Sequence, residues 1–155
     1  MRLLLLRHGE AGFDAPSDYK RCLTSSGVLR LQVMLETAAA ELTHVDRIVH
    51  SPYLRTVQTA ELVKKEKQKQ KEQGLVLQPL DLLIPESSPQ AVIDWLSEQE
   101  DESLLLVTHQ PLIGYLVSLL CEGDLSRPEP MLPGAMVVID LEVPGAGLGR
   151  LLGRY

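Results

Sequence analysis

The sequence predicts an α/β domain of three layers, in which a mostly parallel central sheet lies between flanking helices. Short apolar runs alternate along the chain with longer stretches whose apolar residues recur at helical spacing, and this alternation is typical of parallel sheets with crossover helices. With 155 residues, the chain is long enough to bury a core of its own. We therefore expect one domain over residues 1–155.

The first half of the chain predicts two strands and two helices. A first strand is expected at Leu3–Leu6, before a long polar loop that runs to Thr24. Helical spacing of apolar residues begins at Val28 and reaches Leu42, and the residues just before it offer candidate N-caps at 24, 25 and 26. A short strand at 47–50 then leads into a helix that Ser51 can cap, that Pro52 can begin and that Gly74 ends.

The second half repeats this order. The stretch "LVLQPLDLLI" indicates a strand bent near Pro79, and Pro89–Gln99 a short helix that places Trp95 in the core. An apolar strand at Leu104–Val107 precedes a helix that begins near Pro111. After the proline-rich loop "SRPEPMLPG", the segments "AMVVIDLEV" and "GRLLGRY" are expected as closing strands.

Charge and cysteine content narrow the classes of function. Fifteen basic and 21 acidic residues give a net charge of −6, which disfavours general binding to nucleic acid or anionic membranes. The lysine-rich run "KKEKQKQKEQ" contains no aromatic residue for base stacking, so we interpret it as a solvated helix face. Cys22 and Cys121 fit small, partly buried, reduced thiols, and no apolar run is long enough for a membrane span. A cytoplasmic protein is expected.

Three short polar clusters each follow a predicted strand: "RHGE", "HSPYLR" and "THQP". The carboxyl ends of parallel strands lie along one edge of an open α/β sheet, and ligands usually bind there. The three clusters are therefore expected to share one cleft.

The residues of these clusters suit a phosphoryl group. The guanidinium forks of Arg7 and Arg55 match phosphoryl oxygens, and Arg55 falls in the first turn of its helix, where the backbone also favours an anion. A neutral imidazole can attack phosphorus, and nearby arginines favour the neutral ring, so His8 is the candidate nucleophile. His109 and the arginines would stabilise the transferring group. Taken singly, each of these residues is more often structural in proteins. The sequence shows neither a P-loop nor metal-ligand spacing, so we expect no metal and no cofactor.

The motifs resemble a known family. "LLRHGEA", "SPYLRTVQTA" and "VTHQPLIG" are similar, in this order, to the blocks of the histidine phosphatase superfamily, also called phosphoglycerate mutase-like. "DAPSDYKRCLTSSG" and the small size resemble SixA-type phosphohistidine phosphatases, over most of residues 1–120. The resemblance implies His8 as the phosphoryl acceptor, Arg7, Arg55 and His109 as the phosphate pocket, and Arg21 as a further phosphate contact.

The general acid is the open part of the site. Many larger members of the superfamily carry an acid on an insertion after the middle strand, where this chain offers only the compact "LIPESSP" with Glu86. Asp18 in the first loop is the other candidate, and Glu10 lies beside the nucleophile. A weak acid suits phosphohistidine, because imidazole has a conjugate-acid pKa of roughly 6.5 and leaves more readily than an alkoxide. The short insertion also leaves room for a protein-borne phosphohistidine.

The sequence thus predicts a phosphohistidine phosphatase that acts on a protein, such as the histidine phosphotransfer domain of a bacterial sensor kinase, through phospho-His8. One alternative is a broad phosphomonoesterase or mutase for small metabolites, in which Glu86 or Asp18 would be an effective acid. A second alternative is a non-catalytic module that binds phosphate or a phosphoprotein. The paired His8 and His109 disfavour that alternative, because a binding site needs no nucleophile.

Overall fold

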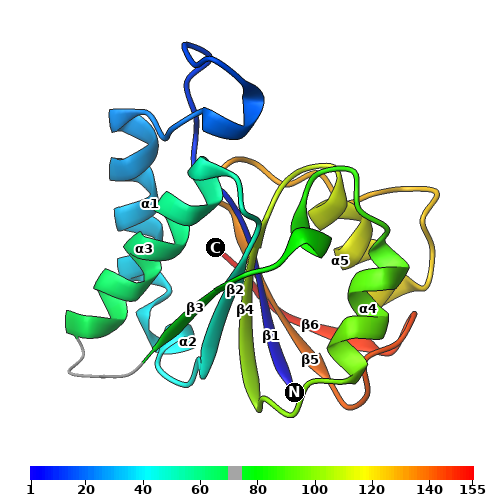
Figure 1. Cartoon of the computed structure of the whole chain (residues 1–155). Coiled ribbons are helices and arrows are strands. Elements are labelled where there is room, and N and C mark those ends of the chain that lie inside the picture. The colour runs from blue at the N-terminus through cyan, green and yellow to red at the C-terminus, as the bar shows by residue number, and fades with distance from the viewer. Residues whose placement is uncertain (70–74) are drawn as a thin grey trace.

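A computed structural model of the chain describes residues 1–69 and 75–155 and shows an α/β fold around one sheet (Figure 1). In these residues the sheet has six strands in the order β3-β2-β4-β1-β5-β6. The first four strands along the chain run parallel to one another, whereas β5 is antiparallel to β1 and β6 to β5. The expected mostly parallel sheet is confirmed. The strands are β1 Arg2–Arg7, β2 Arg47–His50, β3 Val76–Pro79, β4 Ser103–Thr108, β5 Met136–Leu141 and β6 Gly149–Arg154.

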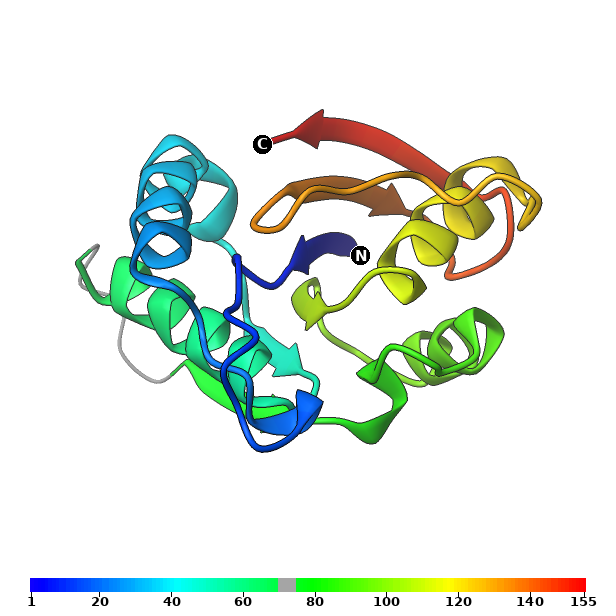
Figure 2. The same ribbon diagram turned by 90° about the horizontal axis from the view of Figure 1, so that it is seen from above.

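Helices cover both faces of the sheet, which confirms the three layers. Seen from above, α1, α2 and α3 lie on one side and α4 and α5 on the other (Figure 2). Two short 3-10 turns, η1 and η2, lie in the connections. The bounds are η1 Asp18–Lys20, α1 Ser25–Thr37, α2 Ala39–Leu42, α3 Leu54–Lys69, η2 Asp81–Leu83, α4 Pro89–Ser97 and α5 Leu112–Glu122.

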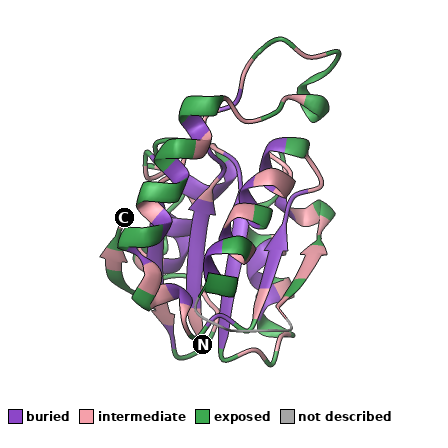
Figure 3. Ribbon diagram, turned by 90° about the vertical axis from the view of Figure 1, so that its left-hand side faces the viewer, coloured by how far each residue is buried: buried purple, intermediate pink, exposed green. Residues whose placement is uncertain are grey.

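The central strands carry the core, which is why their sequences are continuous apolar runs (Figure 3). Side chains of β1 alternate between the two faces: Leu3 and Leu5 pack with α4 and α5, while Leu4 and Leu6 pack beneath α1 and α3. Every residue of β4 is buried. This doubly covered centre holds the ends of β1 and β4 side by side, and both strands lead directly into polar residues.

Several helix boundaries differ from the expectation. The first helix begins at Ser25 because Thr24 is its N-cap, with the Thr24 Oγ1 accepting a hydrogen bond from the Gly27 N–H at 2.9 Å. Leu42 lies in the separate short helix α2. The next helix begins at Leu54 rather than at Pro52, and Ser51 uses its side chain mainly elsewhere, as described below. The expected end at Gly74 lies outside the described residues.

The interpretation of the lysine-rich run as a solvated face is wrong for two of its residues. Lys67 is buried, and its ammonium group donates hydrogen bonds to the carbonyl oxygens of Leu42, Thr43 and Val45. Leu42 is the last residue of α2 and Val45 lies just before β2, so the lysine ties the end of this helix to the entry of the strand. Glu66 is also buried and pairs with Lys69.

Three smaller expectations concern side chains and membranes. Both cysteines are free thiols, but Cys22 is exposed rather than partly buried, whereas Cys121 is half-buried. Trp95 is half-buried and packs against the core. None of the helices in the described ranges combines the length and apolarity that a membrane crossing requires.

Candidate active site

The sheet brings the three polar clusters together. Arg7 at the end of β1 pairs with Thr108 at the end of β4, and His50 at the end of β2 pairs with Val107. The residues that follow these strand ends therefore meet. The rings of His8 and His109 lie 5.1 Å apart between their centroids, and the Arg55 Nε is 3.2 Å from the His8 Nε2. The expectation of one shared cluster is confirmed.

His8 is held as a neutral imidazole. Its Nδ1 lies 2.7 Å from the Gly9 carbonyl oxygen, which can only accept, so Nδ1 carries the proton and Nε2 keeps its lone pair. The side chain is 7% exposed, and this burial lowers its pKa to about 4 against the opposing effect of the Gly9 hydrogen bond. The positive charges of nearby arginines, Arg55 foremost, lower the pKa further. The Nε2 lone pair that nucleophilic attack would require is therefore present at neutral pH.

His109 supplies a hydrogen-bond donor. Its Nε2 lies 2.8 Å from the Ser51 Oγ, which also accepts from the Tyr53 N–H at 3.5 Å. When the Ser51 hydroxyl donates to Nε2, the proton of the neutral ring lies on Nδ1, which is then a donor. Burial and the neighbouring His8 lower the pKa of His109 to about 3. In the described part of the chain, its buried Nδ1 has no hydrogen-bond partner.

Arg7 leaves a second buried donor unpaired. Its Nη1 donates to the Met131 carbonyl oxygen at 2.5 Å, whereas its buried Nε has no partner among the described residues. Burial, followed by the charge of Arg55, lowers the pKa of Arg7. Buried N–H groups usually have partners, and although Arg2 and Arg47 in the described ranges also leave a buried Nε unpaired, only the donor of Arg7 belongs to the cluster around His8. A phosphoryl group would satisfy both the Arg7 Nε and the His109 Nδ1.

Arg55 links the nucleophile to the first long loop. It is buried in the first turn of α3, and besides its contact with His8 it donates from Nη1 to the Asp18 carbonyl oxygen at 2.7 Å. Its Nη2 donates to the Asp18 carboxylate at 3.1 Å. The guanidinium group also lies 4.9 Å from the centre of the Tyr53 ring. The negatively charged carboxylate of Asp18 therefore lies against Arg55, at the expected phosphate pocket.

Arg21 organises the same loop. Its Nη1 pairs with the Asp18 carboxylate at 2.9 Å, and its Nε and Nη2 donate to the carbonyl oxygens of Gly12 and Ala11. Its charge is one of those that lower the pKa of His8, which places Arg21 within electrostatic range of the nucleophile. Its direct contact with phosphate stays a prediction.

The two candidate acids differ in their surroundings. Partial burial raises the pKa of Asp18, but hydrogen bonds from Arg21 and Arg55 outweigh this and lower it. Asp18 is therefore a carboxylate that accepts hydrogen bonds. Glu86 is exposed in the loop after η2, and its charge lies near enough to Tyr53 to add to the burial that raises the pKa of that phenol.

Glu10 faces away from the chemistry despite its place beside His8. Its carboxylate accepts hydrogen bonds from Thr24 and Ser26 and pairs with Arg30, so it stabilises the start of α1. Gly9 allows the backbone to approach α1 closely, because a Cβ there would lie 2.4 Å from the Leu31 side chain.

The roles of three side chains at the site do not follow from the sequence pattern alone. Ser51 was interpreted as a helix cap, but it orients His109. The tyrosines Tyr53 and Tyr19 were not singled out, although Tyr53 packs edge-on against His109 at 4.9 Å between ring centroids. The place of Ser51 and Tyr53 in the strand-end cluster "HSPYLR" is the feature of the sequence that could have indicated a role at the site.

Loss of the Ser51 hydroxyl is expected to slow turnover with little effect on folding. Ser51→Ala frees the His109 Nε2, and one hydrogen bond of this kind contributes about 0.5–1.5 kcal/mol, so kcat should fall roughly threefold to tenfold. Ser51→Thr retains a hydroxyl and should keep most of the activity. Steady-state kinetics of both variants check this, and an alanine variant with wild-type kcat would contradict the positioning role.

Titration of the two site histidines should occur well below neutral pH. Their pKa values of about 4 and about 3 lie below the ordinary 6.5, so each ring is neutral above pH 6.5 in both folded and unfolded protein. As the pH falls from 6.5 toward 4, the unfolded chain binds protons that the folded protein does not, and stability declines. For His8 the loss amounts to about 3 kcal/mol. Ring resonances in NMR titrations should move below pH 5, and a midpoint near 6.5 for either ring would contradict this electrostatic description.

The fold and this cluster are those of a phosphoryl-transfer protein, and the chain belongs to the histidine phosphatase superfamily. The model of that family, branch 1, matches residues 3–77, which contain Arg7, His8, Arg21 and Arg55. The chain is 30% identical over 154 residues to the phosphohistidine phosphatase SixA of Escherichia coli strain K12, covering 95% of this chain and 89% of the relative. It is 32% identical over 130 residues to a SixA homolog of Haemophilus influenzae, covering 77% of each.

A solved structure of the protein histidine phosphatase SixA in complex with tungstate superimposes on this fold. The TM-score is 0.86 at 29% identity, and the match covers 99% of this chain and 96% of that one. The expected fold family is thereby confirmed. Among the described residues, no group of three or more His, Cys, Asp or Glu side chains is arranged to hold a metal ion.

Proposed function

We propose that this protein is a phosphohistidine phosphatase that removes the phosphoryl group from a phosphohistidine of another protein through a phospho-His8 intermediate. One observation carries the proposal: the lone pair of a neutral His8 lies against Arg55, beside the orphan donors of Arg7 and His109. Two relatives are named as phosphohistidine phosphatases, which supports this substrate class. The tungstate in the related SixA structure is a tetrahedral oxyanion like phosphate, which supports a phosphate site.

The reaction requires two in-line displacements. The His8 Nε2 gives its lone pair to phosphorus as the phosphorus–nitrogen bond of the substrate breaks. The departing imidazole nitrogen keeps the electron pair of the broken bond and takes a proton from solvent water or from the general acid. Arg55 must turn its Nε–H from the His8 Nε2 to a phosphoryl oxygen, where the donors of Arg7 and His109 add to the stabilisation. Water then attacks phosphorus, the bond to His8 breaks and inorganic phosphate leaves. The proton that this water loses stays with the released phosphate or passes to solvent.

For the partner, we propose the histidine phosphotransfer domain of a sensor kinase. We also propose that residues 1–155 form one catalytic domain and that the two proteins meet in the cytoplasm. The segment between β3 and α4 is short and holds only η2 and the loop with Glu86, so a histidine projecting from a protein surface can approach the site. Small sugar phosphates would gain little enclosure there. A phosphomonoesterase would need an efficient acid, and the lowered pKa of Asp18 disfavours one of the two candidates.

A substrate comparison tests the proposal. Release of inorganic phosphate is measured in metal-free buffer from a phosphohistidine-bearing phosphotransfer domain, p-nitrophenyl phosphate and 3-phosphoglycerate, with the wild-type protein and with His8→Ala. We expect strong preference for the phosphohistidine protein and no turnover by the variant. Preference for 3-phosphoglycerate would favour the metabolite phosphatase instead, and binding without turnover of any of the three would favour a binding module.

The acid should matter more for alkyl esters than for phosphohistidine. Since general acid catalysis contributes about 10²–10⁴-fold where a poor leaving group must be protonated, Glu86→Gln should lower turnover of 3-phosphoglycerate at least tenfold but that of phosphohistidine less than threefold. Asp18→Asn tests the other candidate, and because Asp18 also holds Arg55, a positioning role alone predicts equal losses for both substrates. The outcome is read as kcat for each substrate. If Glu86→Gln affects neither substrate and Asp18→Asn affects the ester, Asp18 is the donor.

A further inference from the structure

Four rings form a continuous row at the site. The rings of His8 and His109 are 5.1 Å apart between centroids, those of His109 and Tyr53 are 4.9 Å apart, and those of Tyr53 and Tyr19 are 5.0 Å apart. The first two pairs meet edge to face and the third pair is tilted. The mechanism described above uses the two histidines and gives the two tyrosines no part.

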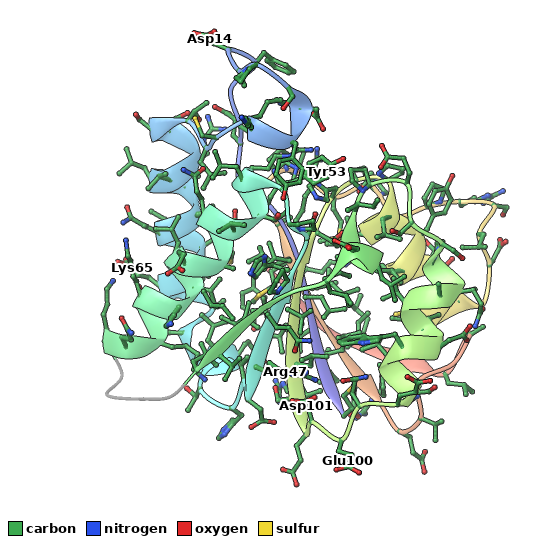
Figure 4. All side chains as sticks on the ribbon, in the orientation of Figure 1. Asp14, Arg47, Tyr53, Lys65, Glu100 and Asp101 are labelled. Carbon is green, nitrogen blue, oxygen red and sulfur yellow. The ribbon has the colours of Figure 1, made fainter. Side chains whose placement is uncertain are left out.

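The row leads from the nucleophile to solvent. His8 and His109 are 7% and 1% exposed, Tyr53 is half-buried, and Tyr19 is 48% exposed. Figure 4 shows Tyr53 at the end of the sheet, beneath the loop whose tip carries Asp14. A substrate that reaches His8 along this row meets aromatic side chains before it meets the phosphate donors.

Tyr19 is held in place by the site itself. It lies in η1 next to Asp18. Asp18 accepts two hydrogen bonds from Arg55 and forms an ion pair with Arg21. Arg55 also lies over the Tyr53 ring. The phosphate-binding arginine thus fixes both tyrosines with respect to the nucleophile, although Tyr19 belongs to an exposed loop.

We infer that Tyr53 and Tyr19 form a subsite for the imidazole ring that leaves phosphorus, and that this subsite makes the protein prefer phosphohistidine over substrates without a ring. The inference rests on the proposed function. In an in-line transfer, the leaving nitrogen lies on the far side of phosphorus from the His8 Nε2, so the leaving ring lies toward solvent. The aromatic row also ends at solvent, at the exposed Tyr19. An imidazole packed against a tyrosine gains an aromatic contact that an alcohol or ammonia cannot make.

Two small substrates with the same type of bond isolate the ring contact. Phosphoimidazole and phosphoramidate both contain a phosphorus–nitrogen bond, but one releases imidazole and the other ammonia. The ratio of their kcat/KM values measures preference for the ring and cancels general damage to the phosphate pocket. The variants are Tyr53→Leu and Tyr19→Leu, with Tyr53→Phe and Tyr19→Phe as matched controls that keep the rings.

Each leucine variant should lower this ratio about threefold to tenfold, the range that one aromatic pair contributes, while each phenylalanine variant should leave it unchanged. Because Tyr19 is exposed, its leucine variant is expected to fold even if Tyr53→Leu does not. Equal losses for both substrates would overturn the subsite and leave the proposed function intact. A wild-type protein that hydrolyses neither these compounds nor a phosphohistidine protein would overturn both.

Discussion

His8→Ala is expected to abolish phosphohistidine turnover, by roughly 10⁴-fold or more, while the protein stays folded. The variant removes the Nε2 lone pair that lies against Arg55, near the unpaired donors of Arg7 and His109. Activity is read from phosphate release and folding from urea unfolding. His8 is buried in its neutral form, and its ring has two hydrogen-bond partners among the described residues, Gly9 and Arg55, so the loss of stability should be modest.

His50→Ala is a closely matched control for this substitution. His50 also follows a central strand, is 6% exposed, and has its Nδ1 2.9 Å from the carbonyl oxygen of the next residue, Ser51. Unlike His8, it is not part of the row of four rings, and among the described residues no arginine contact with its ring is seen. Its variant should retain activity within about tenfold. Equal losses in the two variants would show that burial of a histidine, rather than its chemistry, explains the result.

Arg55→Ala is expected to have the second largest effect, a fall in kcat/KM of roughly 10²–10³-fold. Arg55 contacts the nucleophile, is the first of the charges that lower the His8 pKa, and holds Asp18 by two hydrogen bonds. Its loss therefore weakens phosphate binding and frees the loop. Arg55→Lys keeps the charge but not the guanidinium fork, so it should recover only part of the activity.

The control for Arg55 is Arg30→Ala. Arg30 is also an arginine near a helix start, but it is exposed and pairs with Glu10 away from the histidines. Its removal should change kcat/KM less than threefold, since exposed ion pairs contribute little. Inhibition by inorganic phosphate, measured alongside, should weaken in Arg55→Ala alone. An Arg55→Ala protein with wild-type kinetics would place this arginine outside the site.

The features that depend on short stretches of sequence were predictable. Apolar runs such as Leu3–Leu6 specify strands buried on both faces, and the polar residues that end them mark one edge of the sheet. This rule brings together His8, Arg55 and His109 without any alignment. Thr24 could be proposed as a cap because capping depends on the residues directly after it.

The features that depend on tertiary contacts were not predictable from local pattern. Lys67 looks like one of several surface lysines, and only the return of the chain to β2 gives it buried carbonyls to cap. Ser51 has the sequence position of a helix cap, but the adjacent strand brings His109 to its hydroxyl. Tyr19 and Tyr53 are 34 positions apart, and the Asp18 contacts with Arg55 bring them together.

Detection of phosphate on His8 during turnover tests the central claim most directly. Protein is mixed with a labelled phosphohistidine domain, quenched within milliseconds in alkali because phosphohistidine is unstable in acid, and mapped by mass spectrometry. We predict a phosphoryl group on the His8 Nε2 that forms and decays at rates consistent with kcat and is missing in His8→Ala. Turnover without any phosphorylated enzyme, or with the label on another residue, would contradict the assignment of His8 as the nucleophile.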